Sequence, residues 1–422
     1  MIKKILSLTL VMALLISTAA FAENIVFWNI GTESPDKEIY EHILANYDAN
    51  PVEGFAIENV ATQNDTYKEK LVIAMSSGEC PDVYSSWSGG PMIEYIEAGF
   101  AQPLDDLIGD FKDKIMPGAL AQASYNGHVY AIPYQNVSIS GVFYNTEMFE
   151  KFGLSVPTTV SELEAVCDVL VENGITPFAL ANASKWTGSM YFMSLATRYG
   201  GLEPFQKAAA GTGTFEDECF VYAGTKIQEW VNKGYFPDGV NSLSEDDGQA
   251  KQLMYQETAA MLLCGSWYTG TFKADSPEFA EKISWFSFPK VDGRDDIDTS
   301  IQIGTIGDQF ISFNCTGDKL AAAVNYMSHA FDEDVVQFIV DIGKIPPVVN
   351  APDLVSDPLV KTIMDAALNA SSVQLWYDQY LSPAVAEVHK NTCQEIFGLT
   401  MTPEEANAAL QKAQQEFLAS KA

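Results

Sequence analysis

The chain has 422 residues, of which 56 are acidic and 24 basic, so its formal net charge at pH 7 is −32. A field of that sign repels nucleic acid and anionic lipid, and it disfavours a phosphorylated or strongly acidic ligand. Because 47% of the residues are hydrophobic, a chain of this length can build two cores, and we expect two domains.

The first 22 residues have the pattern of a secretory signal peptide. Lys3 and Lys4 form a short basic region, residues 5–19 form an apolar stretch, and Ala20-Phe21-Ala22 gives the small residues that a signal peptidase requires. The apolar stretch is short for a membrane span, and no later stretch offers about 18 consecutive apolar residues. We therefore expect cleavage after Ala22 and export to the periplasm or the exterior of the cell envelope, with a membrane anchor as the alternative.

Short apolar strands alternate along the chain with amphipathic helices, a pattern typical of α/β domains. The first strand is expected at 25–28. Within 67–75 the apolar residues recur at helical spacing, and Gly78 ends this helix. Further helices are expected from Thr159 or Ser161 to Gly174, at 221–233, at 320–331 and after Thr402, where a capping box precedes the last apolar run.

Five sequence blocks, in a fixed order along the chain, carry a resemblance to a known family. They are residues 67–83 (YKEKLVIAMSSGECPDV), 125–133 (YNGHVYAIP), 144–164, 259–267 (AAMLLCGSW) and 375–409. Together they resemble the family 1 extracellular solute-binding proteins, and the last block is similar to the C-terminal block of the oligosaccharide-binding members. Each block is short, so the resemblance depends on their order over nearly the whole mature chain.

The resemblance implies an α/β fold of two lobes, joined by three chain crossings and separated by a ligand cleft. Pro133, Gly307 and Pro346 lie at the expected crossings, where short irregular segments can absorb the backbone change of hinge closure. The implied crossings are 132–136, 304–308 and 344–348; the implied lobes are 23–133 plus 306–344 and 137–304 plus 346–422.

The resemblance also implies a function. Members of this family bind a solute outside the cytoplasm and deliver it to the membrane permease subunits of an ABC importer. For this chain we expect a saccharide ligand, an oligosaccharide by preference, and a monomeric receptor. We expect no cofactor, no metal ion, no nucleic-acid partner and no enzymatic activity.

Two other functions stay open from the sequence. A secreted glycoside hydrolase would use the same aromatic residues together with a pair of carboxylates, and the many acidic residues make such pairs easy to form. A receptor of the same fold for peptides or polyamines also suits an acidic cleft.

Three tryptophans are candidates for stacking on the apolar face of a sugar ring. Trp267 follows the expected strand 258–263, and ligands bind open α/β sheets at the carboxyl ends of strands. The resembled family places a stacking aromatic at this turn. Trp186 lies in a polar loop, and Trp87 follows a strand that ends at Tyr84. Each of the three could instead pack in a core.

Polar candidates would bond the hydroxyl rim of a sugar, with carboxylates forming the stronger, charge-assisted bonds. Asp378, with its neighbour Tyr377, lies where similar oligosaccharide binders place a sugar-contacting acid, although Asp378 could equally be an exposed acid or a helix cap. Asp65 is expected to cap the helix that follows it and could also face the cleft. The remaining candidates follow the first strand or lie at the crossings: Glu33, Gln135, Asn136 and Asp308.

Overall fold

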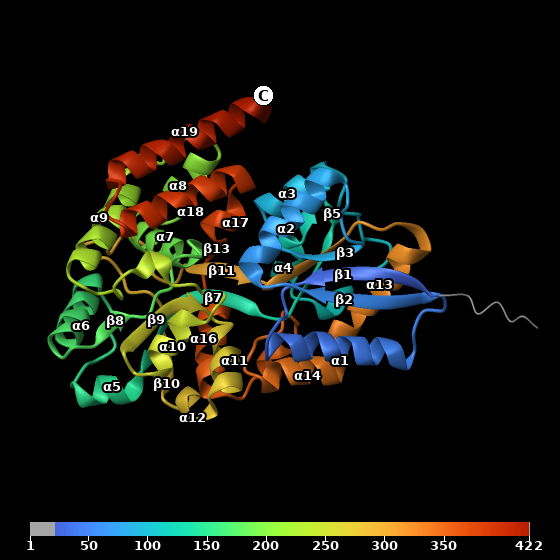
Figure 1. Ribbon diagram of the computed structural model, residues 1–422, viewed down its shortest axis with the longest axis horizontal. Coiled ribbons are helices and arrows are strands. Elements are labelled where there is room, and N and C mark those ends of the chain that lie inside the picture. Colours follow the sequence, from blue (N-terminus) through green and yellow to red (C-terminus); the bar gives the residue numbers. More distant parts are fainter. Residues whose placement is uncertain (1–21, 422) are drawn as a thin grey trace, which may run out of the picture.

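The computed structural model describes residues 22–421, and the expected signal peptide therefore lies, except for Ala22, outside the described residues. Two β-sheets organise these residues, each with helices packed against it (Figure 1). We call the first sheet with its helices the first lobe and the second sheet with its helices the second lobe. The α/β class expected from the sequence is confirmed.

The first lobe is built on a five-stranded sheet that is parallel at one side and antiparallel at the other. Strand β1 pairs in parallel with β2 and β3, and β12 pairs antiparallel with β3 and β6. Helices α1 and α14 lie on one side of these strands and α2 and α3 on the other (Figure 1). The strands, in sheet order, are β2 (Phe55–Ala61), β1 (Glu23–Asn29), β3 (Val83–Ser86), β12 (Gln309–Phe313) and β6 (Ala131–Tyr134).

The second lobe is built around the long strand β7 (Val137–Asn145), in which every residue except Tyr144 is buried. One edge of β7 pairs with β9, and its other edge pairs first with β11 and then with β10, all antiparallel. The other strands of this sheet are β13 (Val373–Gln374), β11 (Gln302–Ile306), β9 (Ala259–Gly265), β8 (Thr176–Phe178) and β10 (Ile283–Phe286).

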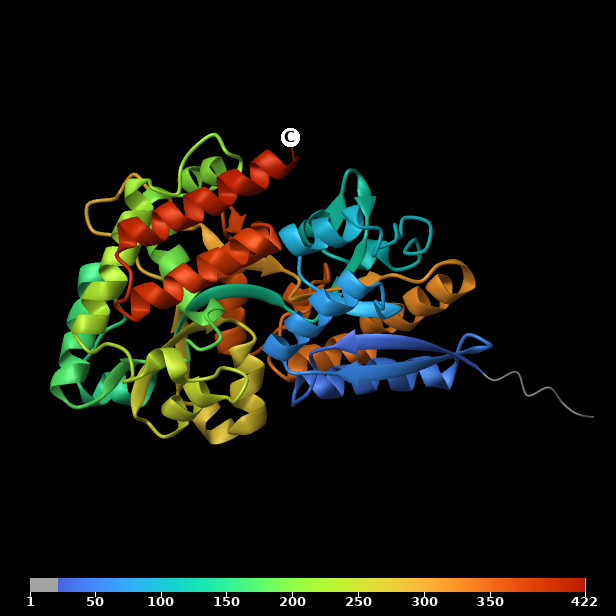
Figure 2. The ribbon, with the colours of Figure 1, turned by 45° about the horizontal axis from the view of Figure 1, so that its top comes forward.

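Helices fill the rest of both lobes, and α18 and α19 run side by side across the second lobe in Figure 2. The helices of the first lobe and its connections are α1 (Asp36–Ala49), α2 (Asn64–Ser77), α3 (Gly90–Glu97), η2 (Lys112–Lys114), α4 (Pro117–Gln122), α13 (Gly317–Ser328), η4 (His329–Phe331) and α14 (Glu333–Asp341), with a small hairpin of β4 (Ser124–Tyr125) and β5 (His128–Val129). The remaining helices are α5 (Thr146–Lys151), α6 (Val160–Glu172), α7 (Trp186–Gly200), α8 (Glu203–Ala209), α9 (Glu218–Asn232), η3 (Val240–Ser242), α10 (Gln249–Tyr255), α11 (Tyr268–Asp275), α12 (Pro277–Ala280), α15 (Ala351–Leu354), α16 (Pro358–Leu368), α17 (Tyr377–Tyr380), α18 (Pro383–Phe397) and α19 (Pro403–Lys421).

The helix boundaries follow the capping chemistry that the sequence indicates, with one exception. Thr159 and Glu162 form a reciprocal capping box at the start of α6, and Thr402 and Glu405 form another at the start of α19. The exception is Asp65, the expected cap of α2. The helix begins at Asn64, two residues before the expected start at Thr66, so Asp65 lies in the first turn and its side chain caps nothing.

The chain passes between the two sheets through short segments. Strand β6 leads to β7 through Gln135 and Asn136, and β11 leads to β12 through Gly307 and Asp308. After α14 a third segment, 344–349, runs beside the first lobe, where Pro347 accepts a hydrogen bond from the Met116 N–H at 2.9 Å. The exact residues that divide the lobes remain a prediction.

The side chain of Asn136, which has no exposed surface, links the first of these segments to the third. Its Oδ1 accepts a hydrogen bond from the Ile345 N–H at 2.8 Å, and its Nδ2 donates to the hydroxyls of Ser138 and Ser266 at 3.1 and 3.2 Å. Both polar atoms of this amide are therefore bonded to other parts of the chain. We therefore correct the expectation that Asn136 offers its amide to a ligand.

Replacement of Asn136 should lower stability. Asn136→Ala would leave the buried Ile345 N–H without a partner, which typically costs about 1–3 kcal/mol. We expect a decrease of that size in the free energy of unfolding measured by urea denaturation. The matched control is Asn232→Ala, at an exposed position at the end of α9. Equal stability of the two variants would contradict this role for Asn136.

Candidate ligand-binding site

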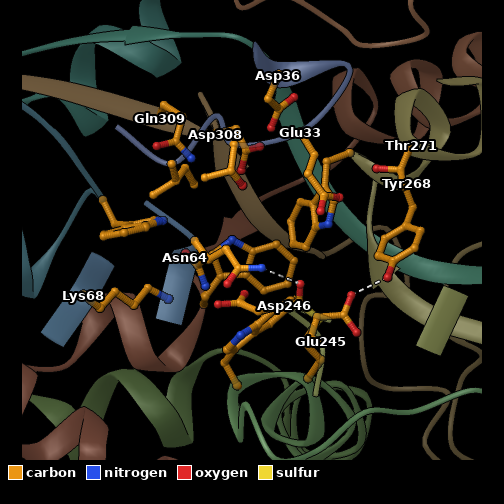
Figure 3. A pocket seen from close by; sticks show the side chains of 18 of the residues that line it. Glu33, Asp36, Asn64, Lys68, Glu245, Asp246, Tyr268, Thr271, Asp308 and Gln309 are labelled. Carbon is orange, nitrogen blue, oxygen red and sulfur yellow. Dashed lines mark hydrogen bonds between the residues drawn. The ribbon is translucent and has the colours of Figure 1, made fainter. Parts of the chain in front are cut away.

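A cavity of ≈ 250 Å³ lies between the two lobes and takes its walls from both (Figure 3). The first lobe contributes the loop after β1, the start of α2, the residue after β3 and the start of β12. The second lobe contributes the start of α7, the loop before α10, the turn after β9 and the segment at α17. The polar and aromatic side chains of its wall include Glu33, Asp36, Gln63, Asn64, Lys68, Trp87, Trp186, Glu245, Asp246, Lys251, Trp267, Tyr268, Asp308, Gln309, Trp376, Asp378 and Gln379.

Four tryptophans line this cavity, three of them from the second lobe. The ring of Trp267 lies 6.0 Å from that of Trp186 at 58° and 6.1 Å from that of Trp376 at 64°, so the three indoles form an angled wall. Trp87 contributes a ring from the first lobe, and the Lys68 ammonium lies 4.6 Å from its centroid. Indole faces in such a wall can stack on the C–H face of a ring-shaped ligand.

The position of Trp267 follows from the end of strand β9. The indole folds back over Gly265, where a Cβ would lie 1.9 Å from the ring. Only glycine therefore allows this placement. Ser266, between the two, is held by the Asn136 amide. The turn that carries Trp267 is thus bonded to the same buried amide that joins the first and third chain crossings.

The cavity is acidic. Six of its lining residues are carboxylic acids and two are lysines. Burial raises the pKa of Glu245 to about 7, while the Tyr268 hydroxyl, which donates a hydrogen bond to Glu245, lowers it in part. Burial raises the pKa of Asp308 to about 6, against the opposing effect of the Lys344 ammonium. Lys344 is itself buried and pairs with Asp36.

The lobes are also in direct contact at the edge of the cavity. The Asp246 carboxylate of the second lobe accepts a hydrogen bond from the Asp65 N–H at 2.8 Å, at the start of α2 in the first lobe. The Gln63 amide donates to the Asp246 carbonyl at 3.2 Å. The Lys251 ammonium lies 3.7 Å from the Glu33 carboxylate. These contacts describe a closed arrangement of the two lobes.

Most of the candidates from the sequence do lie on the cavity wall. These are Trp267, Trp186, Trp87, Asp378, Glu33 and Asp308.

Four candidates lie elsewhere. Asp65 lines a neighbouring groove. Gln135, like Asn136, is buried in the first crossing. Tyr377 is 1% exposed and stacks on Phe205 at 3.6 Å in the hydrophobic core, so the expectation that it contacts ligand is corrected.

Several lining residues were not anticipated. Trp376 is adjacent to the predicted pair at 377–378, but a helix of four residues gives no periodicity from which to tell which neighbour faces the cavity. Glu245 and Asp246 lie in an acidic loop that resembles an ordinary solvated turn in sequence. Lys68 lies inside the block 67–83 of the family resemblance, and that block could have indicated its place on the wall. Among residues 22–421, no group of three or more His, Cys, Asp or Glu side chains is placed to hold a metal ion.

The raised pKa of Glu245 makes a prediction about stability and pH. Between pH 4.5 and about 7 the folded protein keeps a proton on Glu245 that the unfolded chain releases. The contribution of this carboxyl to the free energy of unfolding is therefore fully present below pH 4.5 and is lost as the pH rises through about 7. Glu245→Gln should remove part of that loss. As the pH rises from 5 to 7.5, the free energy of unfolding of the variant, measured by urea denaturation, should increase by about 1–3 kcal/mol relative to that of wild type.

The control for this experiment is Glu278→Gln, at an exposed position in α12. It should follow the wild-type curve, because Glu245 is unchanged in this variant. Parallel curves for Glu245→Gln and wild type would contradict the buried state of this carboxyl.

A family model for bacterial extracellular solute-binding proteins matches residues 37–337. Among curated relatives, an ABC transporter extracellular-binding protein of Pyrococcus horikoshii is 29% identical over 260 residues, which are 59% of this chain and 56% of the relative. The xylose/arabinose-binding protein of Haloferax volcanii is 25% identical, and the match covers 55% of this chain and 51% of the relative. The chain therefore spans about half the length of these two relatives. A "probable sugar-binding periplasmic protein" of Rhizobium meliloti is 24% identical over 91% of this chain and 92% of its own.

Solved structures also match this chain over most of its length. A structure from a study of xylan utilization by Caldanaerobius polysaccharolyticus has a TM-score of 0.84 and 30% identity, and the match covers 92% of this chain and 99% of that one. A chitin oligosaccharide binding protein also has a TM-score of 0.84; at 23% identity it shows the fold alone, over 94% of this chain and 98% of that one. The two-lobed fold and the resemblance found in the five sequence blocks are confirmed. The chain belongs to the bacterial extracellular solute-binding protein family.

Proposed function

We propose that this protein is the receptor of an ABC importer, which captures a saccharide outside the cytoplasm and delivers it to the permease subunits. The observation that carries the proposal is the composition of the interlobe cavity. Its wall combines four tryptophans with six carboxylic acids. A sugar has an apolar C–H face and a rim of hydroxyls, which match stacking rings and hydrogen-bond acceptors respectively.

Binding would draw on contacts with both lobes at once. Trp186, Trp267 and Trp376 would stack on the sugar from the second lobe, while Asp308 and Gln309 would meet its hydroxyls from the first. Contacts of this kind exist only when the lobes are closed, so the ligand favours closure through its higher affinity for that state. A dissociation constant of about 1 μM corresponds to a free energy of binding of about −8 kcal/mol.

The charge of the wall narrows the choice of ligand. An excess of carboxylates disfavours anionic ligands and leaves neutral sugars or cations. The names of the relatives support the first choice, since a xylose/arabinose-binding protein and a sugar-binding periplasmic protein are among them. The acidity of the wall keeps a polyamine as the second candidate.

We also propose that the protein has no hydrolytic activity of its own. The family consists of solute-binding receptors, and a receptor must release its ligand intact to the permease. A glycoside hydrolase would instead place two carboxyl groups on either side of a glycosidic bond.

The proposed function can be tested with a thermal-shift screen of mono- and oligosaccharides, with spermidine as the cationic probe. A ligand at a hundred times its dissociation constant adds about 2.7 kcal/mol of stability, which gives a clear rise in melting temperature. We expect a rise with at least one saccharide and no released reducing ends after incubation. A rise with spermidine alone, or the release of reducing ends, would overturn the proposal.

Variants at the wall of the cavity then test the site itself. Trp267→Ala should weaken saccharide binding by about 1–3 kcal/mol, on the scale of aromatic stacking with nucleic-acid bases. Asp378→Asn should weaken binding by about 1.5–3 kcal/mol through loss of a charge-assisted bond. Calorimetric titration measures both. Tyr380→Ala, an exposed ring outside the cavity wall, is the control. Wild-type affinity in a well-folded Trp267→Ala protein would remove this residue from the site.

We further propose that the first 22 residues are a leader removed on export and that the mature receptor is a monomer, which its elution in size-exclusion chromatography would check. No helix within residues 22–421 is long and apolar enough to cross a membrane. N-terminal sequencing of the exported protein should give Glu23 as the first residue, because Ala20 and Ala22 are the small residues that the peptidase requires. A start at Met1 would contradict the leader.

A further inference from the structure

The two lobes touch at the start of helix α3 through a pair of glycines. Gly89 follows strand β3 as the N-cap of α3, and Gly90 is the first residue of that helix. Figure 1 shows α3 of the first lobe beside α17 of the second, and the two helices are in contact. Both glycines lie at this contact, where they face residues 375–382 of the second lobe.

Gly90 has no room for a side chain in the closed arrangement. A Cβ there would lie 2.6 Å from the carbonyl carbon of Leu381 and 3.1 Å from the Cα of Ser382, and the Leu381 carbonyl oxygen would be nearer still. These three nearest atoms all belong to the backbone of the second lobe, so a change of side-chain rotamer cannot relieve the overlap. Glycine in a helix is normally less favourable than alanine, and the approach of the other lobe gives the reason for it here.

Gly89 is required for two reasons. Its φ of 82° lies in the left-handed region, which favours glycine. A Cβ on it would also lie 2.7 Å from the Cδ2 of Leu375 and 3.2 Å from the carbonyl carbon of Gln379, with the Gln379 carbonyl oxygen nearer still. Both glycines thus meet the same short segment of the second lobe. We call this contact, Gly89 and Gly90 against residues 375–382, the glycine seat.

The glycine seat is a contact of shape and not of hydrogen bonds. Among residues 22–421, no backbone hydrogen bond joins Gly89 or Gly90 to residues 375–382, and the Gly89 carbonyl accepts instead from the Ile93 N–H of α3 at 3.0 Å. The contact therefore depends on van der Waals packing, which is lost when the surfaces separate by a small distance. Such a contact can form when the lobes close and break when they open.

The glycine seat lies directly beside the cavity on both lobes. Trp87, on the cavity wall of the first lobe, is two residues before Gly89. Trp376, on the cavity wall of the second lobe, lies within the segment that the glycines meet. A separation of the lobes at the seat would therefore also separate these two rings.

We propose that Gly89 and Gly90 are positioning residues for ligand capture. Because they have no side chains, α3 can reach the backbone of residues 375–382, which brings the tryptophans of the two lobes into the arrangement seen here. A side chain at Gly90 holds the lobes apart without disturbing the fold of either lobe. The proposal concerns lobe closure with any ligand, so its failure would leave the saccharide function proposed above untouched.

Carbodiimide cross-linking of the ligand-free mature protein measures closure, because the reagent joins carboxylates to amines that are in contact. Two suitable ion pairs cross between the lobes. They are Lys421–Glu97 at 2.7 Å and Lys251–Glu33 at 3.7 Å. Mass spectrometry of the linked peptides gives the yield of each interlobe pair.

Gly90→Ala adds the obstructing Cβ without a change of charge, and Gly109→Ala is the matched control. Gly109 is an exposed residue of the first lobe, and no atom lies within 4 Å of the position of its Cβ. Yields are measured relative to the link between Lys273 and Asp357, a pair at 2.8 Å within the second lobe. In Gly90→Ala both interlobe yields should fall about tenfold, because the overlap disfavours the closed state by a factor of that order. Gly109→Ala should match wild type.

The use of two interlobe pairs distinguishes opening of the lobes from a local shift of α3. Glu97 lies at the end of α3, whereas Lys251 and Glu33 lie in α10 and in the loop after β1. Loss of the Lys421–Glu97 link alone would indicate a local shift and would overturn the proposal, as would unchanged yields of both links. In urea denaturation Gly90→Ala should be as stable as Gly109→Ala, because separation of the folded lobes relieves the overlap. A Gly90→Ala protein that does not fold would assign the seat to a permanent interface, which also contradicts the proposal.

Discussion

Two of the segments that pass between the lobes meet at one fully buried amide, that of Asn136, and the placement of the site depends on it. The amide bonds Ile345 in the third segment and Ser266 in the turn after β9. Ser266 in turn donates to the Val137 carbonyl at 2.9 Å, the first residue of β7. Trp267 follows Ser266 directly. The tryptophan wall of the cavity is therefore anchored to the segments that pass between the lobes, and not to a loop that could move independently.

The acidic wall has a physical consequence for the closed state. Carboxylates brought together between two lobes lose water and repel one another, which raises the pKa of Glu245 and of Asp308. The charge of the Lys344 ammonium, which pairs with Asp36, lowers the pKa of Asp308 in part. Hydroxyl groups of a ligand would offset more, because they donate hydrogen bonds to carboxylates without adding charge. A neutral, hydroxyl-rich ligand is thus better suited to this wall than an anion.

The sequence predicted the class of fold and the residues that stand at the ends of strands, because both depend on local patterns. Trp267 and Trp87 follow strands, and both reach the cavity. The errors concern side chains whose direction is decided by tertiary packing. Tyr377 rather than Trp376 was assigned to the ligand, since a single turn of helix gives no period from which to choose.

The Asn136 amide was misread for a related reason. Whether a polar side chain faces a ligand or satisfies buried backbone depends on segments far away in sequence. For Asn136 the deciding partner, Ile345, is more than two hundred residues distant. The acids of the loop before α10 were missed because only the approach of the first lobe turns a solvated loop into a cavity wall.

The contacts that close the two lobes are individually weak, and this matters for a receptor. Glu33, which pairs with Lys251 across the cavity, is 66% exposed, and the partners of the Lys421–Glu97 pair are 49% and 41% exposed. Exposed ion pairs of this kind contribute about 0–1 kcal/mol each. The interlobe bond from the Asp65 N–H to the Asp246 carboxylate contributes about 1.5–3 kcal/mol. A saccharide bound with micromolar affinity contributes several times more than any one of these contacts. The balance between open and closed lobes therefore lies within the range that a ligand can shift, and its departure can open the lobes again.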